Sequence, residues 1–214
     1  PNAEVVDQLR HGRGAPAVYA PALGFGLGQL GQLVKGTASL SDSAFSLIGQ
    51  ARDFATFDRV LAAVKALPAG ASLARAEIAA PRVSPYTLAA TKAGDTVNLT
   101  GYIPAESLRA PLIDAASKTP GIGKILDSLR VADGAPASLD FSNAVGFMLA
   151  QLGQLKAGIA SLSDDLLTVR GEAPSAGIQE AVSGLLKGGL PAGLKLATQE
   201  VSAPVITTPR VSPF

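Results

Sequence analysis

The side chains that most often carry catalysis or bind metals are nearly absent from this chain. Its 214 residues include no cysteine and a single histidine, His11. This composition excludes disulfides, thiolate nucleophiles and zinc sites built from Cys and His. In the internal repeat described below, His11 is the counterpart of Val131 near a strand end, which favours a solvent-exposed residue over a ligand. We therefore expect no catalytic residue, no metal site and no cofactor, and a protein that is not an enzyme, although Ser/Lys or carboxylate chemistry stays open.

Two glycine motifs resemble phosphate-binding loops. Residues 26–31 form a G-x-G-x-x-G, but they lie within a helical apolar stripe rather than between a strand and a helix. Residues 121–124 read Gly-Ile-Gly-Lys and lack both the upstream glycine and the Ser or Thr that would hold magnesium. We interpret the first motif as helix packing and the second as a helix end followed by a basic turn.

The paired carboxylates Asp164 and Asp165 could in principle act as an acid and a base. Their counterparts in the repeat are Asp42 and Ser43, so the other copy has only one of the two carboxylates. A metal ion would require more oxygen ligands than these two side chains supply. The pattern favours a hairpin turn stabilised by Asx hydrogen bonds.

The charge balance excludes a strong electrostatic partner. Formal net charge is +1 and only 16% of residues are charged, so no basic field predicts binding to nucleic acid. Four arginines recur at strand ends, where they could contact lipid phosphate or anionic glycan, or guard strand edges against addition. These candidate lipid or anion contacts are Arg10, Arg82, Arg130 and Arg210.

The N-terminal sequence begins Pro-Asn-Ala-Glu and has no apolar leader, so the compartment cannot be read from a signal peptide. Residues 14–34 form an uncharged run of 21 residues, nominally long enough to cross a bilayer. Its prolines, glutamines and glycines, and the charges in its repeat counterpart, favour an amphipathic helix instead.

An internal repeat determines the expected architecture. Residues 24–33 match residues 146–155, and residues 38–42 match residues 160–164, both at an offset of 122. Residues 6–10 match residues 126–130 at an offset of 120. We therefore expect residues 1–16 to contain the closing strand of a truncated preceding unit.

Each long repeat predicts a helix, a strand pair, a second helix and a final strand. Leucines at helical spacing mark the first helix, ending near Leu33 and Leu155. The strand pairs are expected at 37–42 with 44–51, and at 159–164 with 166–172. Between the long copies, strands at 86–91 and 96–103, a helix from Pro104 and a strand at 125–131 repeat the scheme without the first helix.

We expect an α+β fold of tandem small (α)ββαβ units, each with a mixed three-stranded sheet and helices packed on one face. The predicted divisions are residues 1–16, 17–84, 85–137 and 138–214, the last repeating the second. Units this small have marginal cores alone, so they should stack or share sheet edges.

The strand, turn, strand, Gly, helix, strand order resembles the BON domain (bacterial OsmY and nodulation). Residues 95–103 carry the valine/leucine strand and its glycine, and residues 125–129 carry the strand after the helix. The structural glycine falls at Gly49, Gly101 and Gly171. The middle unit, 85–137, matches closely, and the flanking units are degenerate, with Asp at the turn glycine.

The alternation of close and degenerate units resembles the N-terminal repeat region of certain alphaproteobacterial outer-membrane-protein-A-family proteins. This resemblance implies a periplasmic, outer-membrane-associated module of the cell envelope that attaches to phospholipid or another envelope component, or acts as a spacer. The alternative is a self-assembly or protein-docking module acting through exposed sheet edges. We expect residues 4–10 to add to a sheet edge, in the same chain or in a neighbouring copy.

Overall fold

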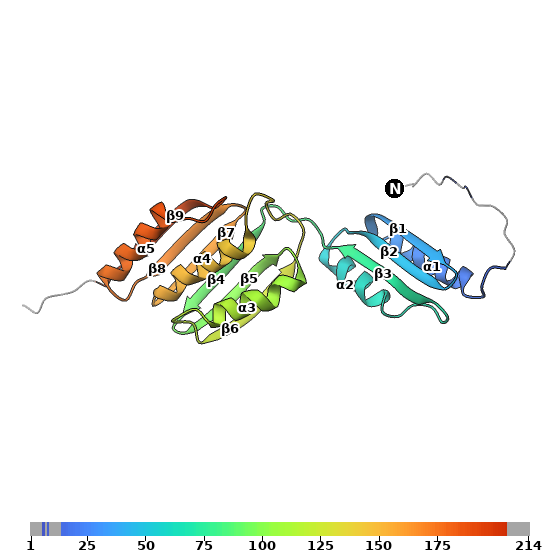
Figure 1. The fold of residues 1–214 in the computed structure, drawn as a ribbon, viewed down its shortest axis with the longest axis horizontal. Helices are drawn as coiled ribbons and strands as arrows, with labels where there is room; N and C mark the ends of the chain where they lie inside the picture. The colour runs from blue at the N-terminus through green and yellow to red at the C-terminus, as the bar shows by residue number, and fades with distance from the viewer. Residues whose placement is uncertain (1–5, 7, 9–13, 205–214) are drawn as a thin grey trace, which may run out of the picture. The chain divides into compact units, whose positions relative to one another are not determined.

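The computed structural model describes Val6, Gln8 and residues 14–204. His11 and most of the predicted strand at residues 4–10 therefore lie outside the described residues. The chain divides into two compact units, Pro1–Pro81 and Arg82–Phe214, which we call the N-terminal and C-terminal units and describe separately (Figure 1).

The N-terminal unit has one mixed three-stranded sheet in the order β1-β2-β3. β1 runs antiparallel to β2, and β2 runs parallel to β3. The elements are α1 (Tyr19–Leu30), β1 (Leu33–Ser41), β2 (Ala44–Ala51), α2 (Phe54–Ala63) and β3 (Ser72–Ala79).

The C-terminal unit has one six-stranded sheet in the order β6-β5-β4-β7-β8-β9. Its first half comprises β4 (Thr87–Ala93), β5 (Thr96–Ile103), the 3-10 turn η1 (Glu106–Leu108), α3 (Arg109–Ser117) and β6 (Lys124–Val131). Its second half comprises α4 (Phe141–Gln154), β7 (Ala157–Ser163), β8 (Leu166–Glu172), α5 (Ala176–Gly188) and β9 (Lys195–Ser202).

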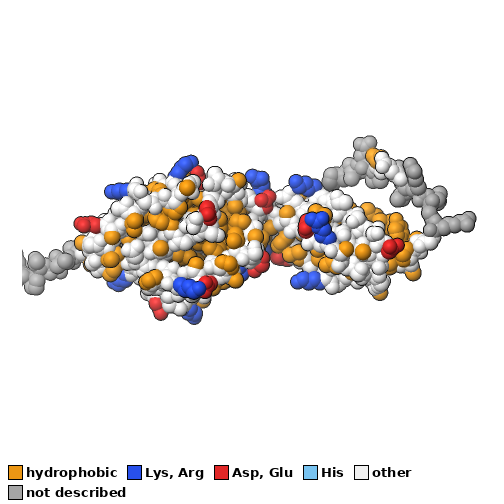
Figure 2. Space-filling view, viewed as in Figure 1, with side chains coloured by type: hydrophobic (Ala, Val, Ile, Leu, Met, Phe, Trp, Pro, Cys, Tyr) orange, Lys and Arg blue, Asp and Glu red, His pale blue; other side chains and the backbone are white. Residues whose placement is uncertain are grey.

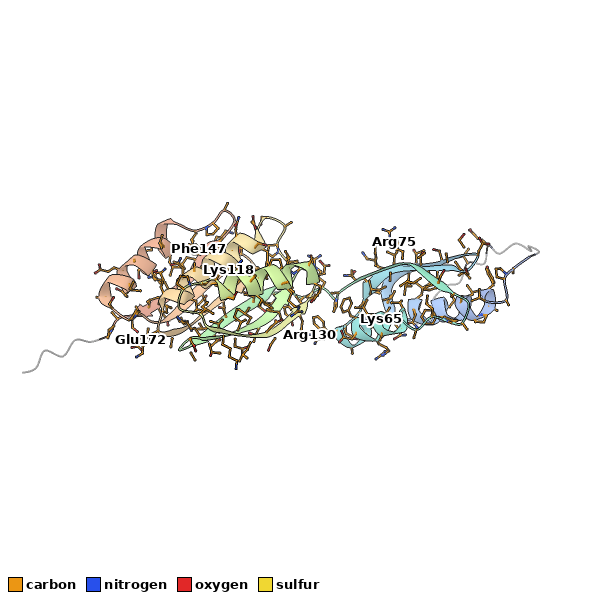
Figure 3. All side chains as sticks on the ribbon, turned by 60° about the horizontal axis from the view of Figure 1, so that its bottom comes forward. Lys65, Arg75, Lys118, Arg130, Phe147 and Glu172 are labelled. Atoms are coloured by element: carbon orange, nitrogen blue, oxygen red, sulfur yellow. The ribbon has the colours of Figure 1, made fainter. Side chains whose placement is uncertain are left out.

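The predicted α+β class is confirmed, with both sheets mixed and the helices of each unit on one face (Figures 1 and 3). In the N-terminal unit, Phe45 and Leu47 of β2 pack with Val60 of α2, and Phe25 of α1 packs against the same core. The opposite face of this sheet carries charged and polar side chains together with exposed Ile48. There Arg75 points away from the helices (Figure 3) and forms a 2.8 Å ion pair with Glu77.

The segments predicted as 85–137 and 138–214 share one sheet. β4 and β7 pair antiparallel along their full lengths, with Ala90 opposite Ala160. This seam joins two three-stranded halves, and α4 contacts both β4 and β7 across it. α4 also lies between α3 and α5, so a single helix covers the middle of the sheet.

Side-chain caps set three of the helix starts. Asp53 accepts a hydrogen bond from the Thr56 amide at α2, which lowers the pKa of the Asp53 carboxyl. Asp140 at α4 and Ser175 at α5 accept from the amide three residues later. Such caps satisfy amides that have no partner inside the helix.

Two boundaries differ from the sequence prediction. Leu33 and Leu155 were assigned to helical stripes, but α1 ends at Leu30 and α4 ends at Gln154. Leu33 instead begins β1 opposite Ala51, four residues before the predicted strand. The Leu33 side chain is buried in the strand, as it would be in a helix. The spacing of apolar residues therefore cannot tell whether this position ends a helix or begins a strand.

Within the part of the chain that the structure describes, no helix has the length and hydropathy needed to cross a bilayer.

Candidate functional site: an apolar groove beside an open strand edge

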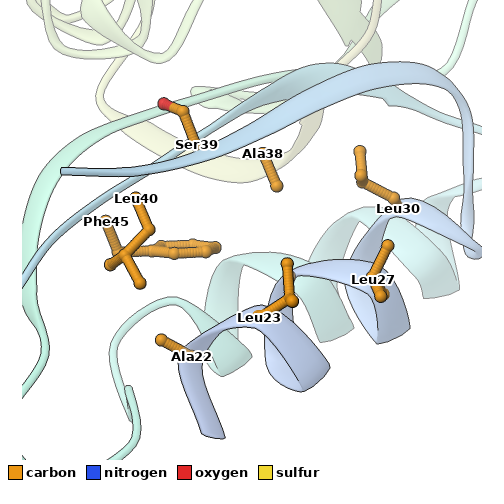
Figure 4. Close-up of a pocket in the computed structure, with 9 residues that line it drawn as sticks. Ala22, Leu23, Leu27, Leu30, Ala38, Ser39, Leu40 and Phe45 are labelled. Atoms are coloured by element: carbon orange, nitrogen blue, oxygen red, sulfur yellow. The ribbon is translucent and has the colours of Figure 1, made fainter. Parts of the chain in front are cut away.

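The N-terminal unit carries an apolar groove between α1 and β1 (Figure 4). It holds about 290 Å³ of empty space, including space open to solvent. The side chains that face the groove are small, aliphatic or aromatic, whereas Ser39 lies along it with its side chain turned to the other side of the sheet (Figure 4). The lining residues are Ala22, Leu23, Gly26, Leu27, Leu30, Ala38, Ser39, Leu40 and Phe45.

One side of the groove exposes large apolar side chains. Leu23 is 42% exposed and Leu27 is 61% exposed on α1, and both line the groove. Hydrophobic side chains gather on the visible face of this unit where α1 and β1 lie (Figure 2). Contiguous exposed apolar surface of this kind marks interaction sites more often than isolated exposed residues do.

The groove borders an unpaired strand edge. Among the described residues, β1 pairs with β2 alone and forms the end of its sheet. Such an edge presents a row of amides and carbonyls that can accept another strand. Backbone pairing and apolar burial are therefore offered side by side.

Eight of the nine matching positions are buried in the C-terminal unit, and the ninth, Ser161, is half-buried. The nine counterparts at an offset of 122 are Ala144, Val145, Met148, Leu149, Leu152, Ala160, Ser161, Leu162 and Leu167. Val145, the counterpart of Leu23, is 1% exposed, and Leu149, the counterpart of Leu27, is 0% exposed. The positions of Leu23 and Leu27 are thus surface in one unit and core in the other.

The difference is the three-stranded half that precedes α4. Its strand β4 pairs with β7, the counterpart of β1. Its helix α3 packs beside α4, the counterpart of α1. No half of this kind covers α1 and β1 in the part of the chain that the structure describes.

A buried lysine secures this covering half. Lys92 of β4 is only 5% exposed, and its Nζ donates to the carbonyls of Gly153 at 2.7 Å and Leu155 at 2.6 Å. These carbonyls stand at the end of α4, where the helix dipole favours a cation. Burial lowers the pKa of the Lys92 ammonium, while Asp95 opposes that change.

A close approach of backbones completes the contact. A Cβ on Gly153 would lie 2.6 Å from the Pro120 carbonyl oxygen and 2.7 Å from the Thr119 methyl group. Gly121, predicted as a turn after a helix, has a φ of 83° and packs on the Gly153 carbonyl. The Gly-Ile-Gly-Lys motif therefore serves contact between the halves.

The carboxylates at residues 164 and 165 have separate structural contacts. Asp164 has a φ of 53°, its carboxylate accepts from the Tyr86 amide at 2.8 Å, and its own amide donates to the Tyr86 carbonyl. Asp165 forms a 2.6 Å ion pair with Lys195. Asp42 has the same φ of 53° at the matching turn of the N-terminal unit.

The G-x-G-x-x-G at residues 26–31 belongs to α1. Gly26 is buried, and a Cβ there would lie 3.2 Å from both Ala38 and the Phe45 ring. Its counterpart is Met148, and the counterpart of Phe45 is Leu167. The N-terminal unit thus pairs a small residue, Gly26, with a large ring. The C-terminal unit pairs a large residue, Met148, with a smaller side chain.

The three predicted structural glycines occupy matching places in β2, β5 and β8. Gly101 alone among them has a positive φ, 104°, and a Cβ there would lie 2.8 Å from Leu88 Cα. Gly49 and Gly171 lie opposite Gly36 and Gly158, and a Cβ would meet the backbone of the neighbouring strand.

Two of the four candidate arginines fall within the described residues. Arg82 and Arg130 are exposed, and Arg82 pairs with Asp133 in an isolated parallel bridge near the end of β6. Arg10 and Arg210 lie outside the described residues, so the expected set of anion contacts stays a prediction.

A cluster of charged side chains joins α3 to β6. Arg109 contacts Glu106 and Asp127, each at 2.6 Å, and also donates to the Leu129 carbonyl at 3.0 Å. All three nitrogens of the Arg109 guanidinium donate hydrogen bonds. The bonds to Glu106, and then to Asp127, raise the pKa of this group. No group of three potential metal ligands occurs among the described residues.

Sequence reasoning missed both the groove and Lys92. Lys92 lies two residues after Ala90 and four after Leu88 in β4, so strand alternation puts it on the same inward face. That alternation was the signal that could have identified a buried lysine. The groove had no such signal, because residues 24–33 and 146–155 carry the same apolar pattern.

No family model matches the chain, and no curated protein matches it. Among solved structures, it is similar to CdsD, a structural protein of the type III secretion system of Chlamydia trachomatis. The match has 13% identity and a TM-score of 0.24, and covers 85% of this chain and 91% of that chain. The C-terminal domain of CdsD matches with 13% identity and a TM-score of 0.21, covering 82% and 94%.

Proposed function

We propose that this chain is a non-enzymatic module of the bacterial cell envelope that docks other polypeptides. Docking would proceed by strand addition at β1 together with burial of the α1–β1 groove. The observation that carries the proposal is that Leu27 is exposed while its counterpart Leu149 is buried beneath a three-stranded half. The groove is the surface that such an addition would cover.

The envelope location rests on the resemblance to BON domains. That resemblance implies a periplasmic, outer-membrane-associated protein, with phospholipid attachment as the usual activity. We favour protein docking over lipid attachment because the surface combines an apolar groove with a free row of backbone donors and acceptors. A lipid surface would leave those strand-edge groups without partners of matching geometry.

Sedimentation velocity of the full chain over a range of concentrations tests the proposal. With no other partner present, the open surface should produce concentration-dependent association between copies. Leu27→Glu should abolish this association because it places a charge in the groove. Leu185→Glu is the matched control, since Leu185 is 45% exposed on α5 and does not line the groove.

Vesicles of phosphatidylethanolamine and phosphatidylglycerol provide the second arm. We expect no co-sedimentation of the chain with these vesicles. Binding to vesicles that Leu27→Glu removes would instead show that the groove serves lipid attachment. Association that is equal in the wild type and Leu27→Glu would contradict docking at this surface.

A further inference from the structure

We infer that the α1–β1 surface is specific for one kind of partner, a three-stranded ββαβ half like Tyr86–Val131 that carries a lysine at the position of Lys92. This inference rests on the proposed docking function and names its partner. The partner would add its first strand antiparallel to β1, place its helix beside α1, and cap the end of α1 with the lysine.

The strand register follows from the repeat. β4 pairs with β7 from Thr87 opposite Ser163 to Ala93 opposite Ala157. At an offset of 122, β7 residues 157–163 correspond to residues 35–41 of β1. The partner's counterpart of Ala90 would therefore lie opposite Ala38, which lines the groove.

The residues that follow α1 match those whose carbonyls bind Lys92 in the C-terminal unit. Gly31 and Leu33 stand where Gly153 and Leu155 present their carbonyls to Lys92. Gly153 must be glycine because Thr119 and Pro120 of the covering half approach it closely. Gly31 has no such need within the described residues, because its φ is −61° and a Cβ there would lie 3.6 Å from the nearest atom, the Leu27 carbonyl oxygen.

Glycine is favoured after a helix when it takes a positive φ, but Gly31 has a φ of −61° and makes no use of that freedom. A glycine at residue 31 therefore makes physical sense as the place where a partner's backbone approaches. Asp42 adds a second matching feature. Its φ of 53° equals that of Asp164, whose carboxylate and amide bind the backbone of Tyr86 at the start of the covering half.

A second copy of the N-terminal unit can bury the exposed leucines of α1, which is enough for weak association between copies, but it fits the α1–β1 surface less well than a ββαβ half does. In the C-terminal unit one helix, α4, contacts both β4 and β7 at the seam and lies between α3 and α5. Two N-terminal units paired through β1 would bring two α1 helices to that single position. A half without a leading helix, such as Tyr86–Val131, avoids this conflict. The sequence of residues 6–10 matches the closing strand of this kind of half.

A chain with an added half tests the inference directly. In this chain a second copy of residues 82–133 replaces residues 1–13 and joins Gly14, at the Gly-Ala-Pro sequence shared by residues 14–16 and 134–136. Backbone amides of β1 that do not bond to β2 should exchange about 100-fold more slowly than in the original chain. Self-association through Leu27 should disappear, because the groove is occupied.

Two variants of the added copy test specificity and register. Lys92→Met in the added copy should lose most of the protection of β1, whereas Lys118→Met, an exposed residue directly after α3, should keep it. Because the protein has no cysteine, a disulfide can report the register. Ala38→Cys should form one with Ala90→Cys of the added copy, and Ser39→Cys, facing the other side of the sheet, should not.

Unchanged exchange at β1 would overturn the inference. An added copy that stays unfolded beside such a β1 would overturn it too, because the same sequence folds against α4 and β7 in the C-terminal unit. If the original chain still associates through Leu27 while the added copy leaves β1 open, the docking function stands and only its partner is wrong. If neither occurs, both fail.

Discussion

Ala90 and Ala160 lie opposite each other where β4 meets β7, and each holds the same place in its own three-stranded half. Each residue precedes a structural glycine, Gly101 or Gly171, by eleven residues. The seam therefore relates two similar halves by an approximate two-fold axis, and α4 is the element that breaks this symmetry. In its described residues, the N-terminal unit is a single half with its own leading helix, and its seam strand β1 pairs on one side only.

The first prediction concerns Leu27 and Leu149, which share a sequence position but differ in burial. Leu27→Glu should change the free energy of unfolding by about 0.5 kcal/mol or less, because the side chain is exposed. Leu149→Glu should cost about 4 kcal/mol or more, because it buries a carboxylate in the core. Urea unfolding measures both values, and similar losses in the two variants would contradict the assigned difference in burial.

The second prediction concerns Lys92. Replacing it by Met should cost about 2–3 kcal/mol, because two buried carbonyls lose their donor. Lys118→Met is the control and should cost about 0.5 kcal/mol or less, since Lys118 forms an exposed ion pair with Asp114. Thermal unfolding of the C-terminal unit is the measurement, and equal melting temperatures for the two variants would count against the role of Lys92.

Lys92 also predicts a pH dependence. Burial lowers the pKa of its ammonium below the ordinary value of 10.5, so the folded protein releases this proton before the unfolded chain does. Stability relative to Lys92→Met should therefore increase as the pH rises through the folded pKa towards 10.5. A constant difference between the two proteins across this range would show that the ammonium is not disfavoured by folding.

The fourth prediction concerns Gly101. Gly101→Val should cost about 1–3 kcal/mol, because it combines a positive φ with a Cβ that meets the backbone of Thr87 and Leu88. Gly94→Ala separates these causes, since Gly94 has a φ of 63° but open space around it. That control should cost about 1 kcal/mol. A Gly101→Val protein with the wild-type melting temperature would contradict the tight packing.

The fifth prediction tests the exchange of volume between Gly26 and Phe45. Gly26→Met alone should cost about 1–3 kcal/mol through overpacking against the Phe45 ring. Combining it with Phe45→Leu recreates the pair Met148 and Leu167, so the double variant should recover part of that loss. A double-mutant cycle measures the coupling, and strict additivity of the two losses would rule out this compensation.

The order of helices and strands could be predicted because the apolar spacing changes from helical to alternating along each unit, although it did not locate the boundaries at Leu33 and Leu155. The pairing of β4 with β7 could not, since sequence indicates that an edge exists and not which strand meets it. The burial of Leu149 and the exposure of Leu27 were equally hidden, because burial depends on a neighbouring half and not on the residue's own segment. The turn at Asp42 and Asp164 likewise showed an unexpected left-handed aspartate where a glycine was anticipated.

The most direct test of docking at the α1–β1 surface is an NMR titration of the full chain against its own concentration. We expect the amide shift changes to concentrate in α1 and β1, around Leu23, Leu27 and Gly36, and to vanish in Leu27→Glu. Shift changes confined to the other sheet edges, at β3, β6 or β9, would contradict the account.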